Sequence, residues 1–255
     1  MNDLLINLLA SAAAAAIGWL AQWLLRYRRL ARKQAFFGLD RGSECVLTMP
    51  RHVSSSKENS VHRRDVAAMV ELATVAKDCR ASVELLSSDE VPATLGRAAE
   101  FCVGGPTAND RTATHLRTML PGVRYESATG EDIVAPFSVG TAAYRREEGR
   151  VEYVLLARVF GPGGGRPVFL IAGQTARTNF AAARYLATSY RTLAKRYGRD
   201  KRFCLVLQVV ESRHYGPDYA EIAADVTPDA FTAPPAPARA EAPEQPAKVP
   251  APDPS

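Results

Sequence analysis

FCVGGPTAN at residues 101–109 and FLIAGQTAR at residues 169–177 share one pattern. Each begins with Phe and two apolar residues, continues with a small residue and Gly, and reaches Thr-Ala after one variable residue. An apolar run that ends at glycine indicates a buried strand, and helical periodicity follows each copy, over residues 110–120 and 178–197. The sequence therefore predicts two strand–turn–helix junctions of the same design.

Junctions of this kind can bind anions. Glycine allows positive φ and a close approach of the backbone to a ligand. The first N–H groups of a helix lack partners within the helix, and they carry the positive end of its dipole. In open α/β sheets such junctions lie at the carboxyl ends of strands, where ligands bind. The alternative is that Thr107 or Asn109 only caps a helix.

The segment that runs from the strand through GGPTAN into the helix resembles the phosphate-facing loops of Rossmann-like nucleotide-sensing domains. The resemblance covers these residues in each copy and concerns the fold. It implies nucleotide binding by analogy. The loop differs from both the Walker and the dinucleotide fingerprints, so the resemblance does not identify the ligand.

A long apolar run precedes this domain. It begins at Leu4 and ends at Leu25, which suits one bilayer crossing of about 20 residues. The basic run RYRRLARK follows at residues 26–33, whereas Asp3 alone is charged before the apolar run. This asymmetry is opposite to that of a signal peptide. It predicts a single-pass plasma-membrane anchor with the N-terminus outside, the main domain in the cytoplasm, and membrane lipid as a partner.

The chain divides into four parts on composition. Residues 1–33 form the anchor and its basic flank, residues 34–43 a linker, residues 44–226 an α/β domain, and residues 227–255 a Pro- and Ala-rich tail that we expect to be disordered. The fold expected is a three-layer, Rossmann-like α/β domain with a mostly parallel sheet and an antiparallel hairpin, preceded by one transmembrane helix. Strands are expected at residues 45–49, 82–86, 101–103, 123–125, 133–139, 141–145, 151–160, 167–172 and 203–210, and helices at residues 64–79, 92–99, 110–120 and 178–197.

Charge and cysteine content exclude some classes of function. The formal net charge of the 255 residues is +5, and much of the excess lies near the N-terminus, so the domain offers no nucleic-acid face. The four cysteines form no C-x-x-C pair, and three of them lie in apolar runs. We expect reduced, buried cysteines and no metal site. No cofactor can be named from the sequence.

Polar residues that follow parallel strands meet at one edge of the sheet. Two helix N-termini and several cations at that edge would suit a phosphorylated small molecule, above all a nucleotide. His52, Arg213 and His214 are also expected there, and the alternative is that the arginines form a solvated rim. The candidate ligand-binding residues are Arg51, Gly104, Gly105, Thr107, Asn109, Gly173, Gln174, Thr175 and Arg177.

The sequence thus predicts a membrane-anchored cytoplasmic domain that binds or senses a nucleotide-like ligand and signals through a protein partner or a homo-oligomer. One alternative is a nucleotide or N-glycoside hydrolase in the same crevice, with Asn109 and Glu211 as residues to test. A second is a non-catalytic membrane scaffold. The sequence lacks a G-x-S-x-G elbow and an H-E-x-x-H motif, so it names no catalytic residue.

Overall fold

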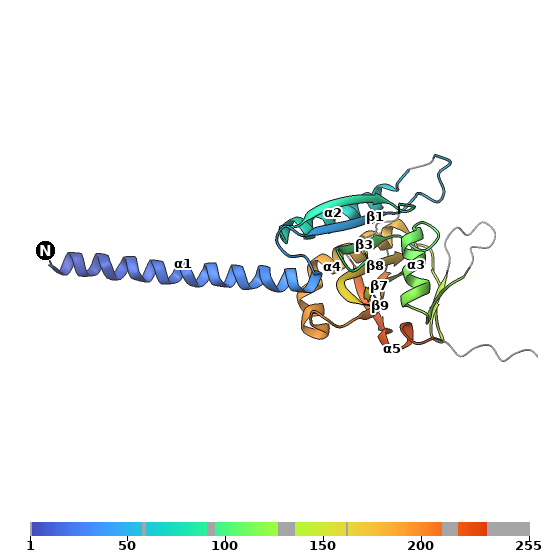
Figure 1. Cartoon of the computed structure of the whole chain (residues 1–255). Coiled ribbons are helices and arrows are strands. Elements are labelled where there is room, and N and C mark those ends of the chain that lie inside the picture. Colours follow the sequence, from blue (N-terminus) through green and yellow to red (C-terminus); the bar gives the residue numbers. More distant parts are fainter. Residues whose placement is uncertain are drawn as a thin grey trace, which may run out of the picture.

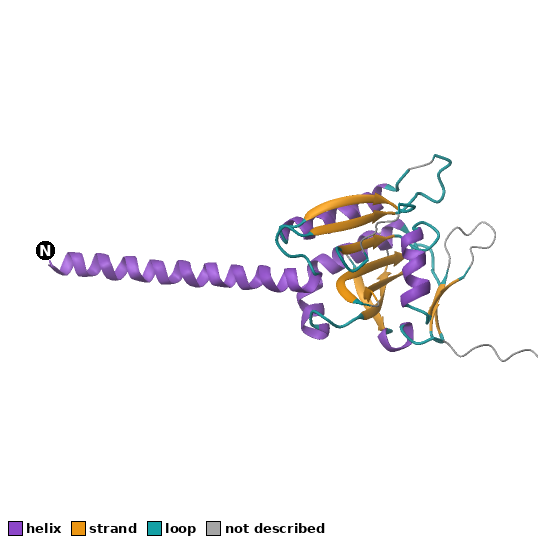
Figure 2. Ribbon diagram, viewed as in Figure 1, coloured by secondary structure: helices purple, strands orange, loops and turns teal. Residues whose placement is uncertain are grey.

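The computed structural model describes residues 2–57, 60–90, 95–126, 136–161, 163–210 and 219–233. Its helices and strands follow one another along the chain as shown in Figures 1 and 2. The strands are β1 (Glu44–Met49), β2 (Ser82–Ser87), β3 (Ala99–Val103), β4 (Val123–Tyr125), β5 (Phe137–Val139), β6 (Ala142–Tyr144), β7 (Val151–Gly161), β8 (Gly164–Gly173), β9 (Phe203–Val210) and β10 (Ala220–Asp225). The helices are α1 (Asn2–Phe37), α2 (Arg63–Asp78), α3 (Asp110–Met119), α4 (Ala176–Tyr197) and α5 (Thr227–Ala230).

A seven-stranded sheet in the order β10-β9-β7-β8-β3-β1-β2 forms the centre of the body. Strands β2, β1, β3, β8 and β9 run in one direction, and β7 and β10 run against them. A separate antiparallel sheet has the order β4-β5-β6. The predicted α/β class with a mostly parallel main sheet is confirmed, since five of its seven strands run in the same direction.

Two hydrophobic clusters place the main sheet between two other layers. One cluster joins α2, α4 and the end of α1 to one face of the sheet. The other joins α3, the small sheet and α5 to the opposite face. Both faces of the central strands are therefore buried, which explains their nearly continuous apolar sequences.

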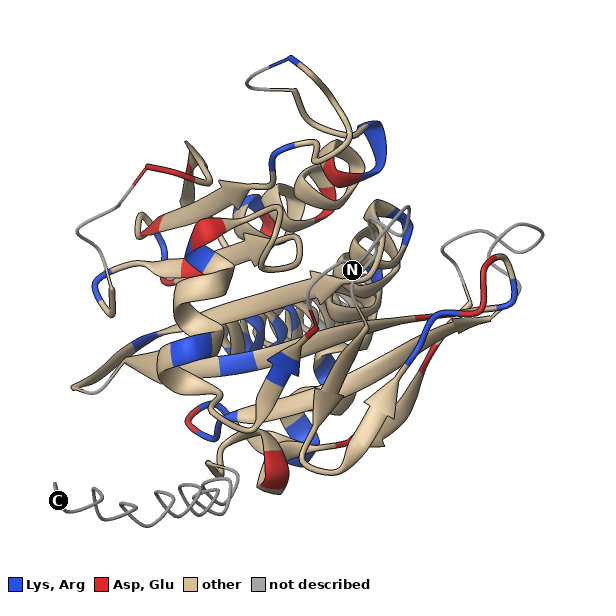
Figure 3. Ribbon diagram, turned by 90° about the vertical axis from the view of Figure 1, so that its right-hand side faces the viewer, with Lys and Arg blue, Asp and Glu red and all other residues tan. Residues whose placement is uncertain are grey.

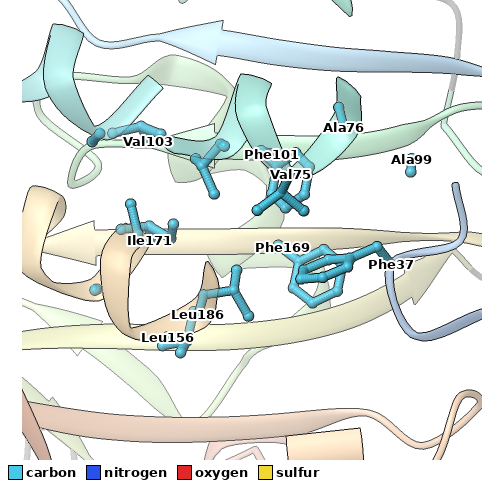
Figure 4. Close-up of a cluster of buried hydrophobic side chains, with 14 of the residues drawn as sticks. Phe37, Val75, Ala76, Ala99, Phe101, Val103, Leu156, Phe169, Ile171 and Leu186 are labelled. Carbon is cyan, nitrogen blue, oxygen red and sulfur yellow. The ribbon is translucent and has the colours of Figure 1, made fainter. Parts of the chain in front are cut away.

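The two copies of the sequence pattern are neighbours in the main sheet. Strands β3 and β8 are parallel, and Phe101 pairs in register with Phe169, as does Val103 with Ile171. The two Phe rings stack with centroids 5.3 Å apart, in the cluster drawn in Figure 4. Residues that match in the sequence are thus register partners in space.

Helix α1 leaves the body as one long rod (Figure 1). Its side chains from residue 11 to residue 29 are exposed, including Trp19 and Trp23. Its last turn instead enters the core, where Phe36 and Phe37 are almost fully buried. A linker was expected at residues 34–43. Its first four residues instead form the last turn of α1, and two of them, Phe36 and Phe37, are buried.

Within the part of the chain that the structure describes, no helix is both long enough and apolar enough to cross a membrane. The transmembrane helix expected between Leu4 and Leu25 is therefore not confirmed.

Three other local expectations differ from the structure. The antiparallel hairpin is formed by β7 and β8 through the glycine turn, because β6 pairs with β5 instead. The helix expected at residues 92–99 is absent from its described part, where Leu95 forms a bridge with Ala98. The tail expected from residue 227 begins with α5, whose Ala230 is buried. Strand β10 was not expected, because apolar and polar residues alternate only weakly in its sequence, AEIAAD.

Candidate functional site

The two glycine turns lie side by side at the carboxyl edge of the main sheet. The N–H of Gly104 donates to the carbonyl of Ile171 over 2.9 Å, and a Cβ added at Gly105 would lie 3.3 Å from the carbonyl oxygen of Gly173. Both turns open into one cavity of about 600 Å³. Residues that follow β1 and residues at the starts of α2 and α4 also line the cavity.

The first turn is held by buried contacts behind the cavity wall. Gly104 has φ of +102°, and a Cβ there would meet the ring of Pro50 at 2.6 Å. Asn109 is fully buried and caps α3 by accepting the N–H of Thr112. Its amide nitrogen donates to the carbonyl of Val103 over 2.8 Å. Gly104 and Asn109 therefore shape the turn, with Asn109 as a helix cap, and neither residue lines the cavity.

The second turn is built differently. Thr175 caps α4 in a reciprocal capping box with Thr178. Its hydroxyl also donates to Oε2 of Glu152 over 2.9 Å. The side chain of Gln174 accepts the N–H of Tyr153 and donates to the carbonyl of Tyr144. The helix of the second copy thus starts two positions earlier in the shared pattern than that of the first copy, whose cap is Asn109.

The structure places most of the predicted site residues on the shared cavity, together with His52. Arg51 lies at its rim, where its guanidinium donates to the carbonyl of Thr107. Arg213, His214 and Glu211 lie outside the described residues. The predicted residues that line the cavity are Arg51, Gly105, Thr107, Gly173, Gln174, Thr175 and Arg177.

Several polar residues of this cavity were not expected from the sequence. Three come from the start of α2, and others come from the turn before β7, from β7 itself and from α4. Two signals were present: Glu152 interrupts the apolar run of β7, and Asn179 interrupts the apolar side of α4. The missed residues are His62, Arg64, Asp65, Arg146, Glu148, Glu152 and Asn179.

Positive charge is concentrated where α2 and α4 begin. Burial, and then the nearby cations Arg177 and Arg63, lower the pKa of Arg64. Burial, and then His52 and the arginines of α2, lower the pKa of His62 as well. Over much of the rest of the body, basic and acidic segments are interspersed (Figure 3). A cation whose pKa is lowered by other cations is stabilised when an anion binds among them.

Two buried carboxylates form the floor of the cavity. Glu152 is 2% exposed and lies 3.5 Å from Nε of Arg146 and 3.7 Å from Nη1 of Arg177. Asp65 accepts a hydrogen bond from Nδ2 of Asn179 over 2.8 Å. Burial raises the pKa of Asp65 to about 6, against the opposing effects of Asn179 and His52. Glu152 thus orients arginines, whereas Asp65 has the pKa of an acid–base group.

A second polar cluster lies on the opposite face of the sheet, between β3 and α3. Ligand atoms of Glu100, Cys102 and His115 all lie within 4.8 Å of one another. Arg111 already binds both carboxylate oxygens of Glu100, over 2.7 and 2.9 Å, and the Cys102 thiol donates to one of them. These contacts satisfy the carboxylate without a metal. Across the described residues all four cysteines are free and buried, as predicted.

The fold and the cavity at the two glycine turns, which we call the carboxyl-edge cavity, define an α/β protein with a candidate anion site at the carboxyl edge of its sheet. Comparison of the chain with protein-family models, with curated proteins and with solved structures found no match.

Proposed function

We propose that this protein binds a nucleotide-like phosphorylated small molecule in the carboxyl-edge cavity. The observation that carries the proposal is the convergence of arginines from separate elements at the starts of α2 and α4. Arg51 follows β1, Arg64 belongs to α2, and Arg177 belongs to α4. Guanidinium groups bind phosphate oxygens with paired hydrogen bonds, and helix N-termini favour the same charge.

The lining of the cavity supports a phosphate rather than a bulky apolar ligand, because most of its residues are polar or charged. Gly105 and Gly173 let the two turns and the start of α4 pack closely, since a Cβ at Gly105 would lie 3.3 Å from the carbonyl oxygen of Gly173 and one at Gly173 would meet the side chains of Thr178 and Asn179. The volume of about 600 Å³ lies within the range of small-molecule sites. The cavity therefore has both the size and the charge for a nucleotide.

The exposed apolar surface of α1 supports membrane association as a second part of the proposal. Ile17, Trp19, Leu20 and Leu25 are each more than half exposed. Apolar surface of this extent marks a contact with lipid or with another protein. Attachment of the cytoplasmic domain to the plasma membrane through α1 remains a proposal.

Replacing Arg64 with Gln is expected to weaken ligand binding about tenfold or more, because a charge-assisted contact to phosphate is lost. The measurement is a thermal-shift titration of the full chain with a panel of nucleoside mono-, di- and triphosphates, in which bound ligand raises the Tm. The matched control is Arg63→Gln, which removes an exposed neighbouring charge outside the cavity lining. If no nucleotide at millimolar concentration stabilises the wild type, the proposal fails.

The buried carboxyl of Asp65 favours hydrolysis of a nucleotide or N-glycoside as a second candidate function. Its pKa of about 6 lies close to neutrality, where a general acid or base is most effective. Asn179 holds one oxygen of the carboxylate in place. Under this candidate, Asp65→Asn abolishes release of phosphate or base from a nucleotide panel, measured by liquid chromatography, while binding is retained.

The substitution Asp65→Asn should also change the stability of the protein, and this effect can be measured apart from activity. The folded pKa of Asp65, about 6, exceeds the ordinary aspartate value of 3.8, so ionisation destabilises the folded state. This loss of free energy of unfolding is absent below about pH 4 and reaches its full size above about pH 6. Asp65→Asn is expected to stabilise the protein by about 2–3 kcal/mol at pH 8, by urea denaturation, and to have little effect at pH 3.5. Asp200→Asn, at an exposed carboxylate, should show no such gain.

A further inference from the structure

A second cavity, of about 420 Å³, lies between α1 and the carboxyl-terminal half of α4. Its floor is apolar and includes Phe36, Ala194 and the ring of Tyr190. Its described lining holds five cations and no acidic residue. We call it the α1–α4 groove, and its cations are Arg29, Arg32, Arg191, Lys195 and Arg199.

The five cations come from two segments that are far apart in the sequence. Arg29 and Arg32 belong to the basic flank of α1, and the others belong to α4 or follow it. The carboxyl end of a helix normally repels anions, because its last carbonyls are unpartnered. Here the buried guanidinium of Arg158 donates to the carbonyls of Tyr197 and Gly198 and offsets that effect. The groove therefore combines positive charge with an apolar floor.

We propose that the α1–α4 groove binds the headgroup of an anionic phospholipid. Charge complementarity supports this occupant, since a phosphodiester would meet cations from both helices. An apolar floor suits the first part of an acyl chain, which a free phosphate lacks. On the same helix, the exposed apolar residues Trp23, Leu24 and Leu25 lie about one turn before Arg29, the first cation of the groove. A lipid in the groove would thus contact charged and apolar groups together.

The groove and the carboxyl-edge cavity are separate sites, so they can be tested separately. The first turn of α4 lines the cavity and its last turns line the groove. A helix of 22 residues places these ends about 33 Å apart, at 1.5 Å per residue. Substitutions in the groove leave the arginines of the cavity intact.

The test is flotation of the full chain with vesicles of phosphatidylcholine alone and with vesicles of equal parts phosphatidylcholine and phosphatidylglycerol. The ratio of the two partition coefficients measures preference for anionic lipid, independently of apolar contacts by α1. The triple variant Arg191→Gln, Lys195→Gln and Arg199→Gln is expected to lower this ratio about tenfold or more. These side chains are exposed in the free protein, so the variant should fold.

A control variant with the same loss of charge distinguishes the groove from general electrostatics. It combines Arg117→Gln, Arg124→Gln and Arg150→Gln, which are exposed and lie outside the groove lining. The proposal requires this control to retain the wild-type ratio, and an equal loss in both variants would overturn it. Stabilisation of the wild type but not of the groove variant by glycerol phosphate, without a preference for anionic vesicles, would also overturn it. Arg64→Gln should keep the lipid preference.

Discussion

Replacing Arg158 with Met is expected to lower the free energy of unfolding by about 3–5 kcal/mol. The side chain of Arg158 is fully buried in the middle of β7, and burial lowers its pKa to about 10, so it stays protonated at neutral pH. Its guanidinium donates to the carbonyls of Lys201 and Phe36, in addition to the last carbonyls of α4. It therefore ties the end of α1 to the end of α4.

Methionine keeps an unbranched apolar stem, ends short of the guanidinium position and removes all of its donors. The loss therefore comes from several buried carbonyl groups that lose their partner, each of which costs about 1–3 kcal/mol if nothing replaces it. Urea denaturation measures the change, with Arg150→Met as the control at an exposed ion pair. A loss below about 1 kcal/mol would mean that the carbonyls find other donors, and it would refute this account of the α1–α4 junction.

Replacing Glu100 with Gln is expected to cost about 3 kcal/mol at pH 7 and to have little effect near pH 2. Burial alone would raise the pKa of Glu100, but hydrogen bonds and charges from His115 and Arg111 outweigh it and hold the pKa at about 2. Because this pKa lies below the ordinary glutamate value of 4.5, the ionised group stabilises the folded state above about pH 4.5. That contribution is lost as the pH falls from about 4.5 to about 2.

The measurement is the free energy of unfolding of both proteins across this pH range. Glu84→Gln is the matched control, since Glu84 is an exposed carboxylate on β2. A constant difference between wild type and Glu100→Gln at all pH values would contradict the assignment, because it would indicate a packing defect rather than loss of an ionised partner. A metal-binding role for the cluster would instead give a difference that chelator removes.

The junctions could be predicted because their signal is local. Glycine at a strand end and the helical pattern that follows it are adjacent in the sequence, and the repeat of Phe101 at Phe169 even anticipates the register of β3 and β8. Asn109, predicted to bind the ligand, is buried and does not line the cavity, for a physical reason. A cap residue before a helix can point into a cavity or into the core, and only the tertiary packing of Asn109 against β1 and β3 decides this.

The rest of the cavity depends on contacts between distant segments. Asp65 meets Asn179 across 114 positions of the chain, and Glu152 meets Arg177 from a different element. Neither pair has a spacing that a sequence pattern can reveal. The end of α1 was missed for a related reason: Phe36 and Phe37 follow a basic, solvent-facing stretch, and their burial becomes evident only when Phe101 and Phe169 are seen beside them.

The capping box at Thr175 and the Arg158 clamp fix α4 at both of its ends. Thr175 holds the first turn to β7 through Glu152, and Arg158 holds the last turn to β7 as well. Strand β7 therefore sets the position of α4 on the sheet at both ends, so the residues that α4 contributes to the cavity and to the groove share one strand as their support.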